Sequence, residues 1–109
     1  MEILIIDSGS EQQECKIVEE FQNADQSILY FRTDKRESLY KSWNRAIGKA
    51  RGQYLTNANT DDRHDRKCLE ILAQELDDKT DIDLVYGNLY KSLKSNEDFV
   101  ENEIKKIQN

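Results

Sequence analysis

No run of apolar residues in this chain of 109 residues is long enough to cross a membrane, since a spanning helix needs about 20 of them. The first residues, MEILIID, also lack the charged and apolar regions of a signal peptide. These two absences predict a cytoplasmic protein without a membrane span. Hydrophobic residues make up 37% of the chain and charged residues 35%, which is typical of one small globular domain with a polar surface.

Cysteine and histidine are scarce, which excludes several kinds of site. The two cysteines, Cys15 and Cys68, are too few for a disulfide framework or a zinc site, so we expect buried free thiols. The single histidine, His64, lies in the charged stretch DDRHDR, where we expect it to face solvent. It has no visible partner for general-base catalysis, and the residues DSGS do not match the elbow that carries a serine nucleophile.

Clustered basic residues are also missing. The net charge is −6, and the pairs Lys35–Arg36 and Lys105–Lys106 are isolated. Because the phosphates of nucleic acids are bound through clusters of lysine and arginine, we expect no nucleic-acid partner. An acidic balance attracts cations in general, so a metal site has to be argued from local residues.

Strand-like and helix-like segments alternate along the chain. Apolar runs predict four strands, at residues 2–7, 27–31, 53–58 and 83–87, and residues 88–93 can form a fifth. Apolar residues at helical spacing predict helices between the strands. Such alternation implies right-handed crossovers and a mostly parallel sheet flanked by helices, which is a Rossmann-like α/β fold. We expect a single domain, with its core at 1–92 and a helical tail at 93–109.

Local signals also predict where the helices begin and end. Ser10 followed by Gln13 has the spacing of a capping box, which satisfies free amides at a helix start. Gly52 stands where a left-handed residue would end the second helix, and Asp65 can cap the third. The helix faces that we expect to form the core carry Cys15, Ile17, Val18 and Phe21, then Leu39, Trp43, Ala46, Ile47 and Ala50, then Leu69, Leu72, Ala73 and Leu76.

Two polar clusters follow predicted strands, at the sheet edge where ligands bind in such folds. The second cluster contains Asn59, Asp61 and Asp62, whose oxygens suit a hard cation such as Mg²⁺ or Mn²⁺. On an extended segment Asn59 and Asp61 would point the same way. Alternatively this is a solvated loop in which Asp62 or Asp65 caps a helix. In the first cluster, Asp7 either accepts from a base or ribose or only organises the SGS turn.

Three segments, in order, resemble motifs of the inverting GT-A glycosyltransferases of family 2. EILIIDSGS resembles their second strand and turn, V-D-D-G-S, and NANTDDR stands where their D-A-D-D motif belongs. ESLYKSWNRAIGKARGQYL resembles their segment G-I-Y-D-A-x-N-K-G-I-x-x-A-x-G-x-Y. The positions shared with that segment are Leu39, Tyr40, Asn44, Ile47, Ala50, Gly52 and Tyr54. The resemblance covers residues 2 to about 90.

The resemblance implies a donor site for a nucleotide-diphosphate sugar. Asp7 matches the acid that contacts the nucleotide base, and Asn44 matches a residue near the nucleotide pocket. Asn59 matches the first acid of the D-x-D motif, which faces the ribose and the metal. Asp61 matches the acid that holds the metal, Mn²⁺ or Mg²⁺, on the donor diphosphate, and Asp62 matches the acid that commonly follows. The metal would stabilise the leaving nucleoside diphosphate as a Lewis acid.

The chain also departs from the family pattern. Ser8 replaces an acid of the turn, which weakens the implied base contact, and Ser38 replaces a common glycine. Asn59 replaces an acid, which lowers the implied metal affinity. The family's first strand and its acceptor half, with the catalytic base, have no counterpart here. We therefore expect a truncated donor-binding domain that is inactive as this short chain alone, with an unidentified acceptor glycan or lipid.

Two other functions fit the sequence. One is a non-catalytic α/β module that forms a homodimer through an exposed sheet edge, because such edges pair readily with other strands, or through a tail helix at 96–108. The other is a phosphate-binding α/β domain, unrelated to sugar transfer, that binds at the turn of Gly9 without preference for a nucleotide.

Overall fold

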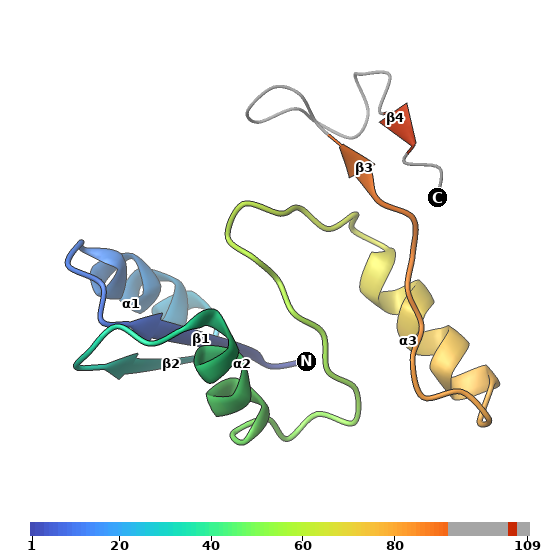
Figure 1. Ribbon diagram of the computed structural model, residues 1–109, viewed down its shortest axis with the longest axis horizontal. Helices are drawn as coiled ribbons and strands as arrows, with labels where there is room; N and C mark the ends of the chain where they lie inside the picture. Colours follow the sequence, from blue (N-terminus) through green and yellow to red (C-terminus); the bar gives the residue numbers. More distant parts are fainter. Residues whose placement is uncertain (92–104, 107–109) are drawn as a thin grey trace. The chain divides into compact units, whose positions relative to one another are not determined.

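The computed structural model describes residues 1–91 and 105–106 (Figure 1). It divides the chain into two compact units, Met1–Asn57 and Ala58–Asn109. The first unit contains β1 (Ile3–Ser8), α1 (Glu14–Ala24), β2 (Ile28–Thr33) and α2 (Leu39–Ile47). The second contains α3 (Cys68–Asp78), β3 (Tyr90–Lys91) and β4 (Lys105–Lys106).

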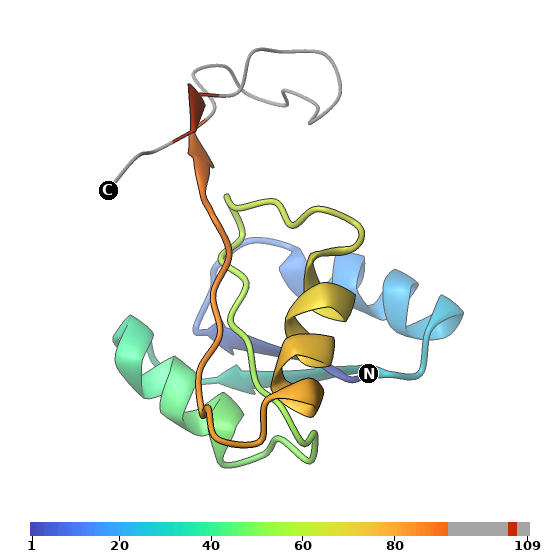
Figure 2. The ribbon, with the colours of Figure 1, turned by 90° about the vertical axis from the view of Figure 1, so that its right-hand side faces the viewer.

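The first unit is built on two parallel strands. β1 and β2 pair in register from Ile3 opposite Ile28 to Ser8 opposite Thr33, and Figures 1 and 2 show them side by side. α1 makes the crossover between them and packs on β2, whereas α2 packs on β1. Apolar residues occupy both faces of β1, as is typical of strands in parallel sheets with helices on both sides. The predicted α/β class is therefore confirmed in this unit.

Little apolar surface is buried in the part of the chain that the structure describes. Val18 is the single apolar side chain that counts as buried there, while the polar residues Asp7 and Ser42 are buried as well. The predicted core faces of α1 and α2 are only partly covered, because Phe21 is 61% exposed and Ile47 is 56% exposed. The physical reason is that two strands offer little surface for helices to cover.

The capping box predicted for α1 is wrong. α1 begins at Glu14, and its cap residue, Gln13, makes no side-chain cap hydrogen bond. The Ser10 hydroxyl instead accepts from the backbone amide of Gln12. Ser10 and Gln13 have the spacing of a capping box, but Ser10 still belongs to the turn after β1. α1 therefore starts later than the sequence predicted.

The predicted end of the second helix is also wrong. α2 ends at Ile47, and its cap residue, Gly48, has right-handed backbone angles, so Gly52 is not a left-handed cap. At the start of α2 the Ser38 hydroxyl accepts from the amide of Lys41, which is an ordinary serine cap. Ahead of α3, the Asp65 carboxylate accepts from the amide of Lys67, in the turn that precedes the helix.

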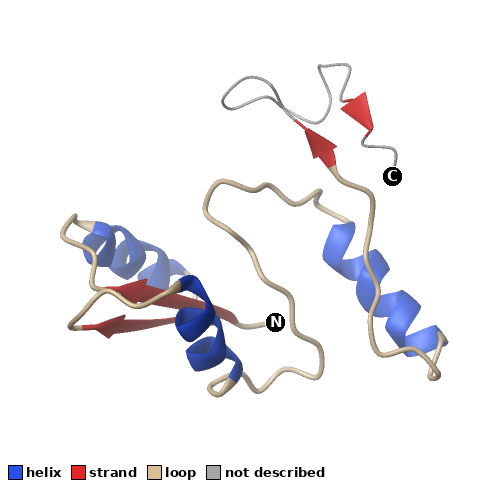
Figure 3. Ribbon diagram, in the orientation of Figure 1, coloured by secondary structure: helices blue, strands red, loops and turns tan. Residues whose placement is uncertain are grey.

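Three of the predicted strands differ in the structure. Residues 53–58 and 83–87 are not strands, and the whole connection between α2 and α3 is loop (Figure 3). Of the described residues 88–91, β3 alone is a strand, and it pairs antiparallel with β4. A strand needs a paired neighbouring strand and a half-buried surface as well as β-forming residues. Residues 53–58 and 83–87 have neither a paired strand nor such a surface.

The predicted tail helix falls mostly outside the described residues. Its two described positions, Lys105 and Lys106, form β4 rather than a helix, and the division into a core at 1–92 and a tail at 93–109 stays a prediction. Among the residues that the structure describes, no helix has the length and apolar character needed to cross a membrane.

A contact between the two ends of the first unit closes it. The backbone amide of Arg51 donates to one carboxylate oxygen of Glu2 at 2.6 Å, and the Arg51 guanidinium donates to the other at 3.2 Å. Because Glu2 precedes β1 directly, this contact returns the chain after α2 to the amino end of the first strand. The unit is thereby held at both ends of β1.

Gly9 allows the turn after β1 to lie against the loop after β2. Its φ is +64°, in the left-handed region, where side chains with a Cβ are strained. A Cβ at this position would lie 2.9 Å from the backbone nitrogen of Arg36 and 2.9 Å from the carbonyl carbon of Lys35. Both the backbone angle and the close approach therefore require glycine.

We predict that Gly9→Ala lowers the free energy of unfolding of the first unit by about 1–2 kcal/mol from the left-handed backbone alone, with a further cost from the backbone clash. The measurement is urea unfolding followed by circular dichroism. Gly48→Ala is the matched control, because Gly48 has right-handed angles and its nearest neighbour to an added Cβ lies at 3.5 Å. A Gly9→Ala chain as stable as the control would contradict the proposed strain.

Candidate functional site

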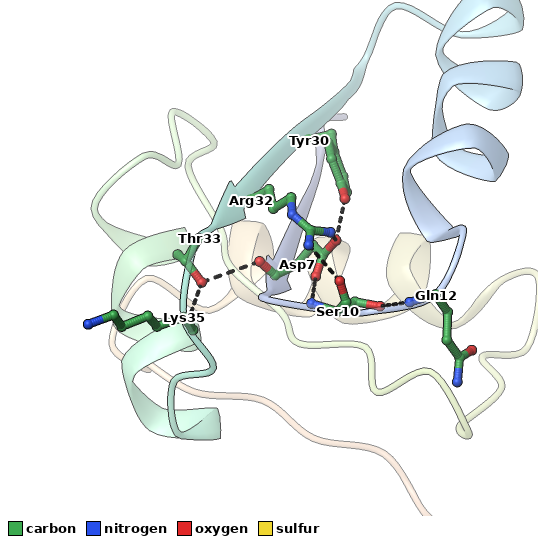
Figure 4. A network of polar contacts seen from close by, with 7 residues as sticks. All are labelled: Asp7, Ser10, Gln12, Tyr30, Arg32, Thr33 and Lys35. Carbon is green, nitrogen blue, oxygen red and sulfur yellow. Dashed lines mark hydrogen bonds and ion pairs between the residues drawn. The ribbon is translucent and has the colours of Figure 1, made fainter.

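A buried carboxylate lies at the carboxyl end of β1 (Figure 4). The residue is Asp7, which is 7% exposed. Its Oδ1 accepts from the backbone amide of Ser10 at 2.7 Å. Its Oδ2 accepts from the hydroxyl of Tyr30 and from Nη1 of Arg32 at 2.9 Å. Three donors from two segments thus converge on one carboxylate at the edge where the sequence predicted a site.

The strand register explains why these groups meet. Asp7 lies opposite Arg32, and Ile5 lies opposite Tyr30. Because side chains alternate between the faces of a strand, Tyr30 and Arg32 project from the same face of β2, toward the face on which Asp7 lies. Neither residue was among those predicted from the sequence. The sequence shows only that these two residues are two positions apart in an apolar strand, and therefore share one face. That they face Asp7 becomes clear only once the register with β1 is known.

Further hydrogen bonds tie the turn after β1 to the loop after β2. Nη2 of Arg32 donates to the carbonyl oxygen of Ser10 at 2.6 Å. The Ser8 hydroxyl donates to the carbonyl oxygen of Glu37 at 3.2 Å and accepts from its amide. Ser8, which stands where the family pattern has an acid, therefore binds backbone groups of the neighbouring loop. These contacts give residues 8–10 a defined shape.

The surroundings of Asp7 hold it ionised. Burial raises the pKa of Asp7, but the hydrogen bonds from Tyr30 and Ser10 and the charge of Arg32 together outweigh burial, and the pKa falls below its ordinary value of 3.8. Burial and the hydrogen bond to Asp7 raise the pKa of Tyr30. At neutral pH the network therefore contains a carboxylate, a protonated phenol and a guanidinium.

Asn44, the other predicted residue in the first unit, lies on α2 with its side chain exposed. Its carbonyl oxygen accepts from the amide of Gly48 at 3.0 Å, as part of the helix end. The structure does not include Asn44 in the hydrogen-bond network of Asp7. Its predicted place near a nucleotide pocket is therefore not tested by these contacts.

The remaining predicted residues belong to the second unit and form a turn. The amide of Asp62 donates to the carbonyl oxygen of Asn59 at 3.1 Å, and the side-chain amide of Asn59 donates to Oδ2 of Asp62 at 2.8 Å. The segment is therefore not extended, and the expectation that Asn59 and Asp61 point the same way by strand alternation is wrong. The Asp61 carboxylate is exposed.

This turn has the oxygen ligands that a hard cation prefers. Two adjacent carboxylates and the amide oxygen of Asn59 suit Mg²⁺ or Mn²⁺. Within the described part of the chain, however, no three residues of the types His, Cys, Asp and Glu gather closely enough to hold a metal ion. A cation at Asp61 and Asp62 would therefore need further oxygens, from water or from a bound diphosphate.

The lowered pKa of Asp7 predicts how stability depends on pH. Its carboxylate contributes stability above its unfolded pKa of about 3.9, and this contribution disappears as the pH falls through the lower folded value. Asp7→Asn should therefore be less stable than the wild type at pH 7, and the difference should shrink as the pH approaches 3. Urea unfolding midpoints of both chains between pH 7 and pH 3 measure this, and a difference independent of pH would contradict the assignment.

Comparisons with known proteins find glycosyltransferases. The chain matches the sequence model of the family described as Glycosyl transferase family 2 over residues 1–107. It is 28% identical over 99 residues to Glycosyltransferase GlyG of Streptococcus pneumoniae serotype 4, covering 91% of this chain and 33% of that protein. It is 28% identical over 88 residues to an uncharacterized glycosyltransferase of Methanocaldococcus jannaschii, covering 81% of this chain and 30% of that protein.

The chain thus spans about a third of the length of these curated relatives. No solved structure matches it significantly. The family match extends through both polar clusters and all the elements of the first unit. It confirms the predicted family and, with the parallel strand pair, the predicted α/β fold class. The chain belongs to glycosyl transferase family 2.

Proposed function

We propose that this chain binds the donor of an inverting glycosyl transfer, a nucleotide-diphosphate sugar, together with a divalent cation, Mn²⁺ or Mg²⁺. The observation that carries the proposal is the family match over residues 1–107, which includes the turn of Asp7 and the turn of Asp61. Family membership implies a nucleotide-sugar donor and an acceptor. The residue roles below extend that statement to positions in this chain.

Asp7 is proposed to accept a hydrogen bond from the nucleotide base. Its ionised state supports this proposal, because an ionised carboxylate offers only acceptors. Three of its roughly four acceptor positions are occupied by Ser10, Tyr30 and Arg32. One acceptor position, on Oδ1, is therefore left for a ligand. Asn44 is proposed to lie near the same nucleotide, and its exposure on α2 leaves its amide accessible.

Asp61 and Asp62 are proposed to hold the cation, with Asn59 facing the ribose. The support is the turn that presents two carboxylates and an amide oxygen from neighbouring residues. A bound Mn²⁺ or Mg²⁺ would supply Lewis-acid stabilisation of the departing nucleoside diphosphate. Because two carboxylates alone bind such ions weakly, we expect the cation and the diphosphate to bind together.

We also propose that the chain, by itself, binds the donor without transferring the sugar. The relatives are about three times as long as the segment that matches. The acceptor, a glycan or lipid, and the catalytic base are not assigned to residues of this chain.

Calorimetric titration tests donor binding directly. We expect one nucleoside diphosphate from a panel to bind in the presence of Mn²⁺ and to bind much more weakly without it. Asp61→Ala should reduce the metal-dependent affinity by at least about tenfold. Loss of a residue that only orients a metal ligand already costs about tenfold or more in metal affinity, and loss of the ligand itself should cost at least as much. Asp81→Ala, which removes another exposed carboxylate of the second unit, is the control.

Two outcomes would contradict the proposal. The absence of heat with every nucleotide, with Mn²⁺ and with Mg²⁺, would show that the chain does not bind a donor. Equal losses of affinity in Asp61→Ala and Asp81→Ala would show that the cation is attracted by general negative charge rather than held at the turn of Asn59 and Asp62.

A second candidate function is a non-catalytic module that dimerises through a sheet edge. The observation that favours it is that β1 and β2 each have one unpaired edge within the described residues, and such edges attract other strands. Light scattering after size-exclusion chromatography distinguishes this candidate, since a chain that remains monomeric at high concentration does not pair through its edges.

A further inference from the structure

We propose that Arg32 is a positioning residue of the donor site, which fixes the Asp7 carboxylate and the shape of residues 8–10. The inference rests on the proposed donor binding and adds a residue that the family motifs do not include. It is carried by the two hydrogen bonds that the Arg32 guanidinium makes to different parts of the turn.

The guanidinium joins the beginning of the turn to its end. Nη1 donates to Oδ2 of Asp7 at 2.9 Å, and Nη2 donates to the carbonyl oxygen of Ser10 at 2.6 Å (Figure 4). A planar guanidinium presents two donors in fixed directions, so it can hold both acceptors at a set separation. The Ser10 amide meanwhile donates back to Oδ1 of Asp7. The turn is therefore closed by its own amide and by a side chain of the neighbouring strand.

The other donors to Asp7 cannot replace this contact. Tyr30 binds Oδ2 but has no hydrogen bond to the Ser10 carbonyl among the described contacts. Loss of Arg32 would leave that carbonyl without its partner and would remove one of the two donors to Oδ2 of Asp7, so the carboxylate would be held less firmly. The single open acceptor position on Oδ1 would then no longer face a fixed direction, and a bound base would lose its partner.

Replacement of Arg32 affects stability as well as binding. The side chain of Arg32 is 43% exposed, whereas that of Asp7 is 4% exposed. Solvent screens the charge of the exposed Arg32, but removing Arg32 takes a donor away from a buried carboxylate, which lowers stability. A misplaced binding group also weakens ligand binding directly. Replacement of Arg32 should therefore lower the urea midpoint as well as the nucleotide affinity, and circular dichroism shows that the variant is folded where its binding is measured.

The experiment compares three variants of the full chain. Arg32→Gln removes the charge and the forked contact, and Arg32→Lys keeps the charge but cannot present two donors in the same fixed directions. Arg51→Gln is the control, because Arg51 also pairs with a carboxylate in the first unit, that of Glu2, but at the opposite end of β1. The probes are uridine, guanosine and cytidine diphosphates with Mn²⁺.

We expect Arg32→Gln to weaken binding of the preferred nucleotide by about tenfold or more, with a lower urea midpoint and a native circular dichroism spectrum. Arg32→Lys should recover part of the affinity, and Arg51→Gln should bind as the wild type does. Unchanged affinity in Arg32→Gln beside normal wild-type binding would overturn the role of Arg32 alone. A wild-type chain that binds none of the nucleotides would overturn the donor-binding proposal, and with it this role.

Nuclear magnetic resonance gives a readout that does not depend on the ligand. The ionisable groups that contact Asp7 are Tyr30 and Arg32, both from β2. Removal of the Arg32 charge should raise the pKa of Asp7, observed at its carboxyl carbon, and should shift the amide signal of Ser10. Arg32→Lys should leave the titration near that of the wild type. An unchanged Ser10 signal and Asp7 titration in Arg32→Gln would overturn the positioning role.

Discussion

The first unit depends on a charge that would be costly to bury without partners. An isolated carboxylate is strongly disfavoured in a protein interior, and Asp7 is one of the few buried side chains described here. Three donors satisfy it, and they come from its own turn and from β2. Because the two donors from β2, Tyr30 and Arg32, reach Asp7 in one register of the two strands, the network selects that register. With so little apolar burial, this polar contact specifies the arrangement that a larger core would otherwise fix.

The sequence correctly predicted the helices and strands that are marked by local patterns. It failed for segments whose structure depends on contacts with another segment. Periodic apolar residues identified β1, β2, α1, α2 and α3, because the spacing of side chains on a helix or strand is a property of the chain itself. Residues 53–58 contain a short apolar run, but a strand exists only beside a ladder partner. The start of α1 was misplaced for a related reason, since Ser10 serves the turn that Asp7 organises.

The candidate site was likewise predicted in part from the sequence. The carboxyl end of β1 and the acid pair after residue 58 were identified because loops at that sheet edge carry ligand-binding residues, and the order of three motifs indicated the family. Tyr30 and Arg32 were not identified, because they lie 23 and 25 residues after Asp7 in the sequence. Only the pairing of β1 with β2 brings them next to it. Asn59 was assigned an extended backbone, whereas its side chain and carbonyl form a turn with Asp62.

The contact between Glu2 and Arg51 has a consequence for the order in which the first unit opens. It closes a loop over a sequence separation of 49 residues, and the entropy lost in closing such a loop is regained as soon as the contact breaks. Arg51 is largely exposed, so added salt weakens its charge interaction, whereas the buried carboxylate of Asp7 is screened much less. Amide hydrogen exchange in β1 should therefore form a gradient, fastest beside Glu2 and slowest beside Asp7, and the amino end of the strand would fray while its carboxyl end remains folded.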